Sequence, residues 1–407
     1  MKILFLSQRF LMPMDTGGKI RTGNILKQLS KQHEITLISN VESPKDDHYL
    51  PEMTGFCSSF ISVPWKEIRK YSPLFFLRLF FQMFSKYPVS VLNDYSSKLR
   101  MALEKELKNK TYDIAVCDFV QSALLFRNIK NIPTLLFQHN VESMIAQRHV
   151  DQNRNPIAKL FWWLQWKKMY SFEEQACHNF NTVIAVSDKD GSFFMEKYHA
   201  NNTVTIPTGV DLDYYKPIDT EHKKTSQIVF CGSMDWLPNE DAVLFYIQDI
   251  LPVIKKSFPD MVLTVVGRNP SPNLKKIVSN TEGIELTGWV DDTRPYIKNA
   301  GVFIVPIRIG GGTRMKIYEA MAMGKAIVST TIGAEGLPLE HGTHIILADT
   351  PEDIGNAVIQ LMKDEDKRNK LGLNARKFVE ANFGWQSVAD VFSGICKMTA
   401  EETKKKK

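Results

Sequence analysis

A stretch in the last third of the chain, 305-VPIRIGGGTRMKIYEAMAMGKAIVST-330, combines three glycines, two cations and one acidic residue. Glycines 310–312 carry no side chains, so a bulky ligand can reach the main chain there. A helix predicted from about residue 314 begins directly after them, and the N–H groups of a helix N-terminus attract anions. Arg314 and Lys316 stand in the first turn, where cations are disfavoured unless an anion is present. The stretch therefore predicts a phosphate site.

Glu319 follows five residues after Arg314 and is expected to face the same side as the glycine turn. A carboxylate there can accept hydrogen bonds from a vicinal diol, and a diphosphate next to a ribose indicates a nucleotide. The alternative interpretation is a surface glycine loop whose two cations are only solvated.

Two further segments combine chemistry with a predicted strand end. The first, 15-DTGGK-19, is a glycine pair before a helix, and it lacks the G-x-G-x-x-G spacing of a dinucleotide-binding turn. The second, 137-FQHNVES-143, places His139 just beyond a strand, which favours a cleft. Ordinary alternatives remain for both segments, namely a helix start without a ligand and a hydrogen-bonded structural histidine. Glu142 is an alternative carboxylate for a covalent route.

These residues sit in a chain of alternating strands and helices, which is typical of doubly wound α/β domains. The alternation restarts after a seam at 203–217, which is rich in proline and glycine. We therefore predict an N-terminal Rossmann-like domain over 1–208 and a second over 209–383, facing a central cleft. A helix at about 384–400 is expected to pack back on the first domain, and 401–407 to be a disordered basic tail. Strands are predicted at 2–7, 34–40, 59–64, 113–118, 134–140 and 182–187, and at 227–233, 261–267, 284–288, 301–306, 325–330 and 344–348.

Composition supports a globular protein and limits its partners. The 407 residues carry a formal net charge of +6, and 43% of them are hydrophobic, which argues against disorder. Part of the charge lies in the final four lysines, and no nucleic-acid-binding pattern occurs, so no nucleic acid partner is expected. Five scattered cysteines indicate reduced thiols. The first apolar run is too short for a signal peptide, and we predict a cytoplasmic protein.

The chain resembles the family 4 glycosyltransferases over nearly all of its length. Its segment 318-YEAMAMGKAIVST-330 is similar to the family's E-A-M-A-x-G-x-P-V-V signature, and 208-TGVDLDYYKP-217 to the family's N-G-V-D-x-x-x-F-x-P segment between the domains. The resemblance implies the GT-B fold, in which two Rossmann-like domains face a cleft. It also implies transfer of a sugar from a nucleoside diphosphate sugar with retention of anomeric configuration, without a metal or other cofactor.

The resemblance also implies roles for individual residues. Glu319 would bind the donor ribose, Gly18 would approach the diphosphate, and His139 would contact the donor sugar near the reacting carbon. The turn 287-TGWV-290 would frame the base. The predicted catalytic residues are His139, Arg314 and Lys316. The predicted donor-binding residues are Gly17, Gly18, Ser233, Gly288, Val290, Gly310, Gly311, Gly312, Thr313 and Glu319.

Two departures from the family pattern bear on the donor. A second acidic residue of the family, eight positions before Glu319, is Gly311 here. The family's G-R-L-x-x-x-K-G cations fall at Ser233 and Pro238, so neither of the usual diphosphate ligands is present. We infer that Arg314 and Lys316 replace them. A non-catalytic homologue that still binds a nucleotide sugar, and a sugar-nucleotide epimerase, are the alternative functions.

Two basic aromatic segments, 65–88 and 157–172, bear on the acceptor. Trp and Phe beside Lys and Arg on a helix suit the surface of an anionic membrane. That interpretation predicts a peripheral protein at the inner face of the membrane with a lipid-linked acceptor, as in envelope polysaccharide or lipopolysaccharide assembly. The alternative is that both helices only cover the N-terminal sheet.

Overall fold

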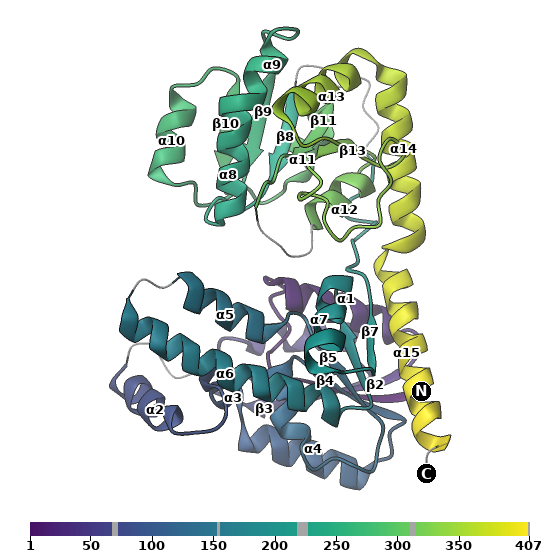
Figure 1. Cartoon of the computed structure of the whole chain (residues 1–407). Helices are drawn as coiled ribbons and strands as arrows, with labels where there is room; N and C mark the ends of the chain where they lie inside the picture. Colours follow the sequence, from purple (N-terminus) through teal and green to yellow (C-terminus); the bar gives the residue numbers. More distant parts are fainter. Residues whose placement is uncertain (67–71, 153–154, 218–226, 310–314, 406–407) are drawn as a thin grey trace. The chain divides into compact units, whose positions relative to one another are not determined.

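The computed structural model describes residues 1–66, 72–152, 155–217, 227–309 and 315–405 (Figure 1). The chain divides into two compact units. The first unit comprises Met1–Pro207 and Val388–Lys407, and the second comprises Thr208–Ser387.

The first unit is built on a seven-stranded sheet with the order β3-β2-β1-β4-β5-β6-β7, and all of its strand pairs are parallel. Parallel strands covered on both faces read as continuous apolar runs, and Ile3 to Leu6 of the first strand are fully buried. The strands are β1 (Lys2–Ser7), β2 (Glu34–Val41), β3 (Ser59–Pro64), β4 (Ile114–Asp118), β5 (Thr134–Phe137), β6 (Thr182–Ala185) and β7 (Thr203–Thr205).

Helices connect these strands and cover the sheet. The helices of this unit are α1 (Gly17–Leu29), η1 (Asp47–Gly55), α2 (Pro73–Met83), α3 (Val89–Asp94), α4 (Ser97–Asn109), η2 (Val120–Phe126), α5 (Glu142–Gln152), α6 (Pro156–Asn179) and α7 (Asp188–Tyr198).

The second unit repeats this arrangement with six parallel strands in the order β10-β9-β8-β11-β12-β13. The strands are β8 (Gln227–Cys231), β9 (Val262–Val266), β10 (Ile284–Gly288), β11 (Val302–Val305), β12 (Ala326–Ser329) and β13 (Ile346–Leu347). The helices are α8 (Leu237–Phe245), η3 (Tyr246–Ile250), α9 (Leu251–Lys255), α10 (Pro272–Ser279), α11 (Arg294–Asn299), α12 (Met315–Ala322), α13 (Pro351–Lys363) and α14 (Glu365–Asn382).

Both sheets reverse their strand order at one point, between β1 and β4 in the first unit and between β8 and β11 in the second. In open α/β sheets, ligands bind beyond the carboxyl ends of the strands at such a reversal. The residues that follow β1, β4, β8 and β11 are therefore the first places to look for a functional site.

The last helix, α15 (Trp385–Lys405), packs on the first unit. The Nε2 atom of His33 lies 2.7 Å from Ser393 Oγ, and the hydroxyls of Thr182 and Thr399 are also 2.7 Å apart. The predicted disordered tail at 401–407 is wrong for residues 401–405, which continue this helix. Glutamate and lysine favour helix, and lysines in the last turn are stabilised by the helix dipole.

The first and last residues of the second unit contact each other. The Val210 N–H donates to the Phe383 carbonyl at 2.8 Å, and Val210 forms a parallel bridge with Gly384. A Cβ atom on Gly209 would lie 2.3 Å from the Trp385 indole. Only glycine allows this close approach, because any side chain at 209 would displace the tryptophan.

Candidate active site

In the second unit, α12 presents Lys316 and Glu319 together. Residues three apart lie on the same face of a helix, and here that face meets the end of β8. The Lys316 ammonium donates to Asn239 Oδ1 at 2.8 Å and lies 4.3 Å from the centre of the Phe230 ring. Asn239 is buried and also donates to the Ser233 carbonyl at 2.8 Å. The Lys316 ammonium is therefore held at the N-terminal end of α8, directly beyond β8.

Gly232 makes room for this lysine. A Cβ atom at 232 would lie 2.7 Å from the Lys316 ammonium and 2.7 Å from Asn239 Nδ2. The family's lysine falls at Pro238, next to Asn239 in the sequence. The ammonium of Lys316 thus lies beside the position where the family pattern has its own lysine.

Glu319 lies between a tyrosine and the Lys316 cation. Burial raises the pKa of Glu319, while a hydrogen bond with Tyr215 and the charge of Lys316 act to lower it. Burial also raises the pKa of Tyr215, so that its hydroxyl stays protonated. A half-buried carboxylate with a neighbouring cation suits recognition of a ribose diol, as the resemblance implies.

Arg268 is a candidate functional residue that the sequence analysis missed. Its Nε atom donates to Ser233 Oγ at 3.0 Å, and Ser233 Oγ in turn donates to Asp235 at 2.6 Å. Arg268 follows β9, and the loops after β8 and β9 are closely packed, because a Cβ atom on Gly267 would overlap the Gly232 carbonyl. A guanidinium therefore reaches Ser233, the position of the family's missing arginine. The adjacency of β8 and β9 creates this contact, and no motif in the sequence indicates it.

The other predicted residues of this unit lie at the end of β10 or outside the described residues. Gly288 ends β10 with a φ of +71°, and Val290 packs partly buried against the core. In the sheet, β9 stands between β10 and β8, and the Gly288 carbonyl accepts the Gly267 N–H at 3.2 Å, so the role of these two residues at the base stays a prediction. Gly310, Gly311, Gly312, Thr313 and Arg314 lie outside the described residues.

In the first unit, Gly17 and Gly18 begin α1. The residue before them, Thr16, makes no side-chain capping hydrogen bond, and the first turn holds no acidic residue. A Cβ atom on Gly18 would lie 2.5 Å from the Phe119 ring and 3.7 Å from the His139 ring, whereas one on Gly17 would meet nothing within 4 Å. Gly18 is therefore the glycine that close packing requires, and it places the start of α1 next to His139.

His139 is buried with both ring nitrogens engaged. Its Nε2 atom lies 2.7 Å from Asp118 Oδ1, and its Nδ1 atom lies 3.2 Å from a guanidinium nitrogen of Arg21. Because arginine can only donate, Nδ1 accepts and Nε2–H donates to Asp118. Burial lowers the pKa of His139 more than Asp118 raises it, so the ring is neutral. This setting favours the interpretation as a hydrogen-bonded structural histidine, and contact with a donor sugar stays a prediction.

Phe119 connects His139 to the switch point of the first sheet. It directly follows β4, has a φ of +63°, and stacks on the His139 ring with the ring centres 4.1 Å apart. A positive φ is costly for a bulky residue, and such strain concentrates at functional sites. The Arg9 guanidinium lies 5.4 Å from the centre of the Phe119 ring. The group Gly18, Phe119 and His139 is thus a packed unit at the carboxyl ends of β1, β4 and β5.

The two glycines give a matched test of this packing. We expect Gly18→Ala to lower the free energy of unfolding by about 1–3 kcal/mol, because the new methyl group must displace the Phe119 ring. Gly17→Ala should change it by less, since the space beside Gly17 is open. Chemical denaturation of the two variants checks the difference. Equal losses of stability would contradict the close packing at Gly18.

A buried carboxylate holds the loop that carries His139. Glu173 on α6 accepts the N–H groups of Glu142 at 2.9 Å and Ser143 at 3.0 Å, and the Tyr198 hydroxyl at 2.9 Å. These N–H groups are at the start of α5, just after His139. Burial raises the pKa of Glu173 to about 7. Burial also raises the pKa of Glu142.

The raised pKa of Glu173 predicts a pH dependence of stability. Between about pH 4.5 and pH 7 the folded chain keeps a proton on Glu173 that the unfolded chain releases, so this residue destabilises the fold as the pH rises. We expect the stability of the native chain relative to Glu173→Gln to fall by on the order of 3 kcal/mol across that range. Urea unfolding at several pH values measures it. A difference that does not change with pH would contradict the raised pKa.

Comparison with known proteins identifies the family. A model of the Glycosyltransferase Family 4 matches residues 16–214, and a model of the group 1 glycosyl transferases matches residues 225–364. The chain belongs to the family 4 glycosyltransferases. This glycosyltransferase is 24% identical to a Klebsiella pneumoniae protein described as an uncharacterized 44.6 kDa protein in the cps region, over 97% of this chain and 99% of that one.

Two further similar proteins are described with an activity or a bound ligand. A phosphatidyl-myo-inositol mannosyltransferase of Mycobacterium tuberculosis is 27% identical over 51% of this chain and 56% of its own length. The crystal structure of Anabaena HepE in complex with UDP has a TM-score of 0.66 at 14% identity, over 98% of this chain and 100% of that one. At that identity the likeness shows the fold, and the predicted α/β GT-B fold of two Rossmann-like sheets is confirmed.

Proposed function

We propose that this glycosyltransferase moves a sugar from a nucleoside diphosphate sugar to a glycan precursor, with retention of anomeric configuration and without a metal. The observation that carries the proposal is the pairing of Lys316 and Glu319 on one face of α12 at the end of β8. A cation suits the diphosphate there, and a carboxylate suits the ribose. HepE was solved with UDP, which makes UDP-sugars the first donors to test.

The proposed chemistry needs a stabilised leaving group. The bond between the anomeric carbon and the diphosphate oxygen breaks, and negative charge develops on the departing diphosphate. Fixed cations and N–H dipoles stabilise that charge, each contributing about 2.7–4 kcal/mol. In the retaining route, the acceptor hydroxyl attacks from the same face and transfers its proton to the leaving phosphate. His139 is neutral, and both of its ring nitrogens are hydrogen-bonded. In this proposal it therefore acts by positioning the groups packed around it.

A thermal-shift screen followed by a transfer assay tests the proposal. A ligand that binds only the folded state raises its apparent stability, so the nucleoside diphosphate of the donor should raise the melting temperature most. The matching nucleotide sugar should then release its sugar in the presence of EDTA. Binding without hydrolysis or transfer would favour the non-catalytic homologue, for which the loss of the family's arginine, lysine and second acidic residue is the motivating observation. Epimerisation of the sugar would favour the epimerase.

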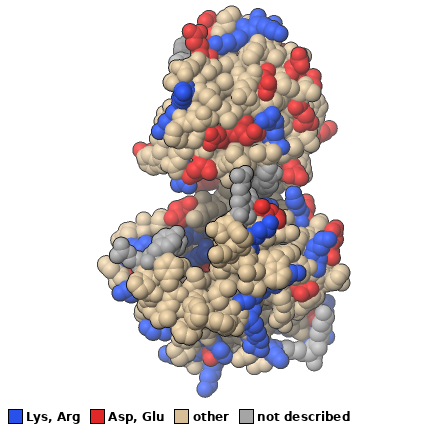
Figure 2. All heavy atoms as spheres, turned by 60° about the vertical axis from the view of Figure 1, so that its left-hand side comes forward, with Lys and Arg blue, Asp and Glu red and all other residues tan. Residues whose placement is uncertain are grey.

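We also place the acceptor at a membrane surface. No helix among the described residues is long and apolar enough to cross a bilayer. However, α2 and the residue that caps its C-terminus, Phe84, expose six large apolar side chains, each more than half accessible: Leu74, Phe76, Leu77, Phe80, Phe81 and Phe84. On α6, Ile157, Leu160 and Trp163 are exposed as well. Figure 2 shows the face that carries these helices as a broad surface of uncharged residues bordered by Lys and Arg.

This surface suits an anionic membrane. Exposed aromatic and aliphatic side chains can enter the interface, while the surrounding cations attract anionic headgroups. A lipid-linked precursor of an envelope glycan is therefore the proposed acceptor class, in keeping with the cps-region relative. In a flotation assay the protein should rise with anionic vesicles, and the triple variant Phe80→Ser, Phe81→Ser, Phe84→Ser should not. Failure of the native protein to rise would remove this part of the proposal.

A further inference from the structure

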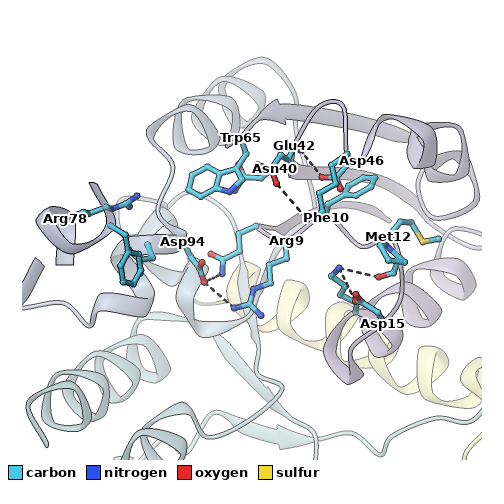
Figure 3. A pocket seen from close by; sticks show the side chains of 16 residues that line it. Arg9, Phe10, Met12, Asp15, Asn40, Glu42, Asp46, Trp65, Arg78 and Asp94 are labelled. Atoms are coloured by element: carbon cyan, nitrogen blue, oxygen red, sulfur yellow. Dashed lines mark hydrogen bonds and ion pairs between the residues drawn. The ribbon is translucent and has the colours of Figure 1, made fainter. Parts of the chain in front are cut away.

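A pocket of about 550 Å³ lies within the first unit, where Gln8, Asn40 and Trp65 meet from the ends of three strands (Figure 3). The Oε1 atom of Gln8 and the Oδ1 atom of Asn40 have no accessible surface, so a ligand in the pocket could not reach them. Three of the cations that line the pocket pair with carboxylates of the same lining. The lining therefore points to no class of ligand. A more informative arrangement surrounds Glu319 in the second unit.

A tyrosine hydroxyl reaches the carboxylate of Glu319. Tyr215 stands where the family's N-G-V-D-x-x-x-F-x-P pattern has phenylalanine, so its hydroxyl is an addition to that pattern. The hydroxyl forms hydrogen bonds with Glu319 and with Thr293. Because an ionised carboxylate can only accept, Tyr215 donates to Glu319, and Thr293 therefore donates to the tyrosine oxygen. The hydrogen bonds thus run in one direction, from Thr293 through Tyr215 to Glu319.

The backbone at Tyr215 is fastened to the helix that carries Glu319. The Arg376 guanidinium of α14 donates to the Tyr215 carbonyl at 2.9 Å and to the carbonyl of Ala322, the last residue of α12. Tyr215 also packs, partly buried, against the apolar core of this unit. Because one arginine binds both backbone segments, the tyrosine hydroxyl is held close to the carboxylate.

The hydrogen bond from Tyr215 helps to keep Glu319 ionised. Burial raises the pKa of Glu319, and the Tyr215 hydrogen bond and the Lys316 charge act against this rise. Among the described residues, Cys231 at the end of β8 also faces Glu319, and burial raises the pKa of its thiol to about 12, so it stays neutral. A protonated carboxyl group has to donate one hydrogen, so it accepts the hydroxyls of a diol less well. Without the tyrosine hydroxyl, the pKa of Glu319 should rise further.

We propose that Tyr215 is a positioning residue for the donor nucleotide, whose hydroxyl holds the Glu319 carboxylate ionised and oriented to accept the ribose diol. This inference rests on the proposed function. A carboxylate can accept about four hydrogen bonds. Within the described part of the chain, Tyr215 is the side chain that donates to Glu319, so acceptor capacity remains for the ribose hydroxyls. In a chain with phenylalanine at this position, the contribution of the hydroxyl would be missing.

The variant Tyr215→Phe tests the proposal, because it removes the hydroxyl and keeps the ring. UDP and 2′,3′-dideoxy-UDP are titrated into the full chain at mildly acidic, neutral and mildly basic pH. The ratio of the two affinities isolates the diol, since both ligands carry the same base and phosphates. In Tyr215→Phe the preference for UDP should fall by roughly 2–10-fold at neutral pH. The fall should be larger at acidic pH, because the pKa of Glu319 is higher without the hydroxyl.

The variant Tyr214→Phe is the matched control. It removes the hydroxyl of the neighbouring tyrosine, which donates to Asp292 at 3.4 Å, and should leave the preference for UDP unchanged at every pH. Thr293→Val removes the donor to Tyr215 and should lower the preference by a smaller factor than Tyr215→Phe does. Thr293 makes no side-chain capping hydrogen bond at the start of α11, so that helix does not need its hydroxyl. Initial rates should show the loss in Tyr215→Phe as a higher KM for the donor, with little change in kcat.

The outcomes separate this inference from the proposed function. If Tyr215→Phe prefers UDP over the dideoxy nucleotide as strongly as the native chain does at every pH, the inference is wrong. An equal loss of preference in Tyr214→Phe would overturn it too, as would a loss in Tyr215→Phe that does not depend on pH. If the native chain binds no nucleoside diphosphate, the transferase function itself fails.

Discussion

Replacing Lys316 with methionine should reduce kcat/KM for the donor sugar by roughly 10²–10³-fold. Methionine keeps most of the apolar stem and removes the ammonium that lies beyond β8. The reduction follows from lost stabilisation of the negative charge on the departing diphosphate. Since that charge belongs to the diphosphate, the affinity for UDP should fall while the affinity for uridine stays constant. Isothermal titration of both ligands, together with initial rates, measures the effect.

Two controls make this result specific. Lys276→Met removes an exposed lysine from α10 in the same unit and should leave kcat/KM unchanged. The Lys316 variant leaves Asn239 Oδ1 without its ammonium donor, which could cost about 1–3 kcal/mol of stability, so its melting temperature must be measured too. If Lys316→Met loses uridine and UDP affinity equally, the lysine does not act on the diphosphate.

Glu319→Gln should weaken UDP binding by roughly 10–100-fold, since hydrogen bonds to a charged group contribute about 1.5–3 kcal/mol. Glutamine has nearly the same size but no charge, so it keeps the packing against Tyr215 and loses the carboxylate that would accept the ribose hydroxyls. The expected loss is in ground-state affinity, and therefore in the KM for the donor, more than in kcat.

A nucleotide without the diol isolates the contribution of Glu319. The native chain should bind 2′,3′-dideoxy-UDP more weakly than UDP, and Glu319→Gln should bind the two with similar affinity. The two substitutions thus predict different patterns of affinity. Lys316→Met should weaken the binding of ligands that carry the diphosphate, and Glu319→Gln the binding of ligands that carry the ribose diol. If Glu319→Gln lowers the affinity for UDP and for the dideoxy nucleotide by the same factor, the carboxylate does not recognise the diol.

Much of the fold follows from local patterns in the sequence. The strands at 2–7, 59–64 and 284–288 are found with the predicted bounds, because buried parallel strands leave short apolar runs. Two elements do not follow from such patterns. The short strand β7 lies in the seam at 203–217, and the helix α14 is not predicted from the sequence. The helix α14 has a low apolar content and repeated charged residues, so its periodicity is weak.

The candidate site was predictable only where one segment carries the whole pattern. Lys316 and Glu319 lie three residues apart on one helix, so their common face could be inferred from spacing alone. Arg268 reaches Ser233 across two strands, and Gln8, Asn40 and Trp65 meet in a pocket from three strand ends. Such contacts depend on which strands become neighbours in the sheet. The hydrogen bonds of the two His139 ring nitrogens depend on the fold in the same way, because their partners come from α1 and β4.

The close contact of Gly209 with Trp385 limits how the second unit can be altered. Both residues belong to that unit, next to its first and last residues, and a Cβ atom at 209 would overlap the indole. Even the smallest substitution at position 209 would therefore have to move Trp385, and with it the start of α15.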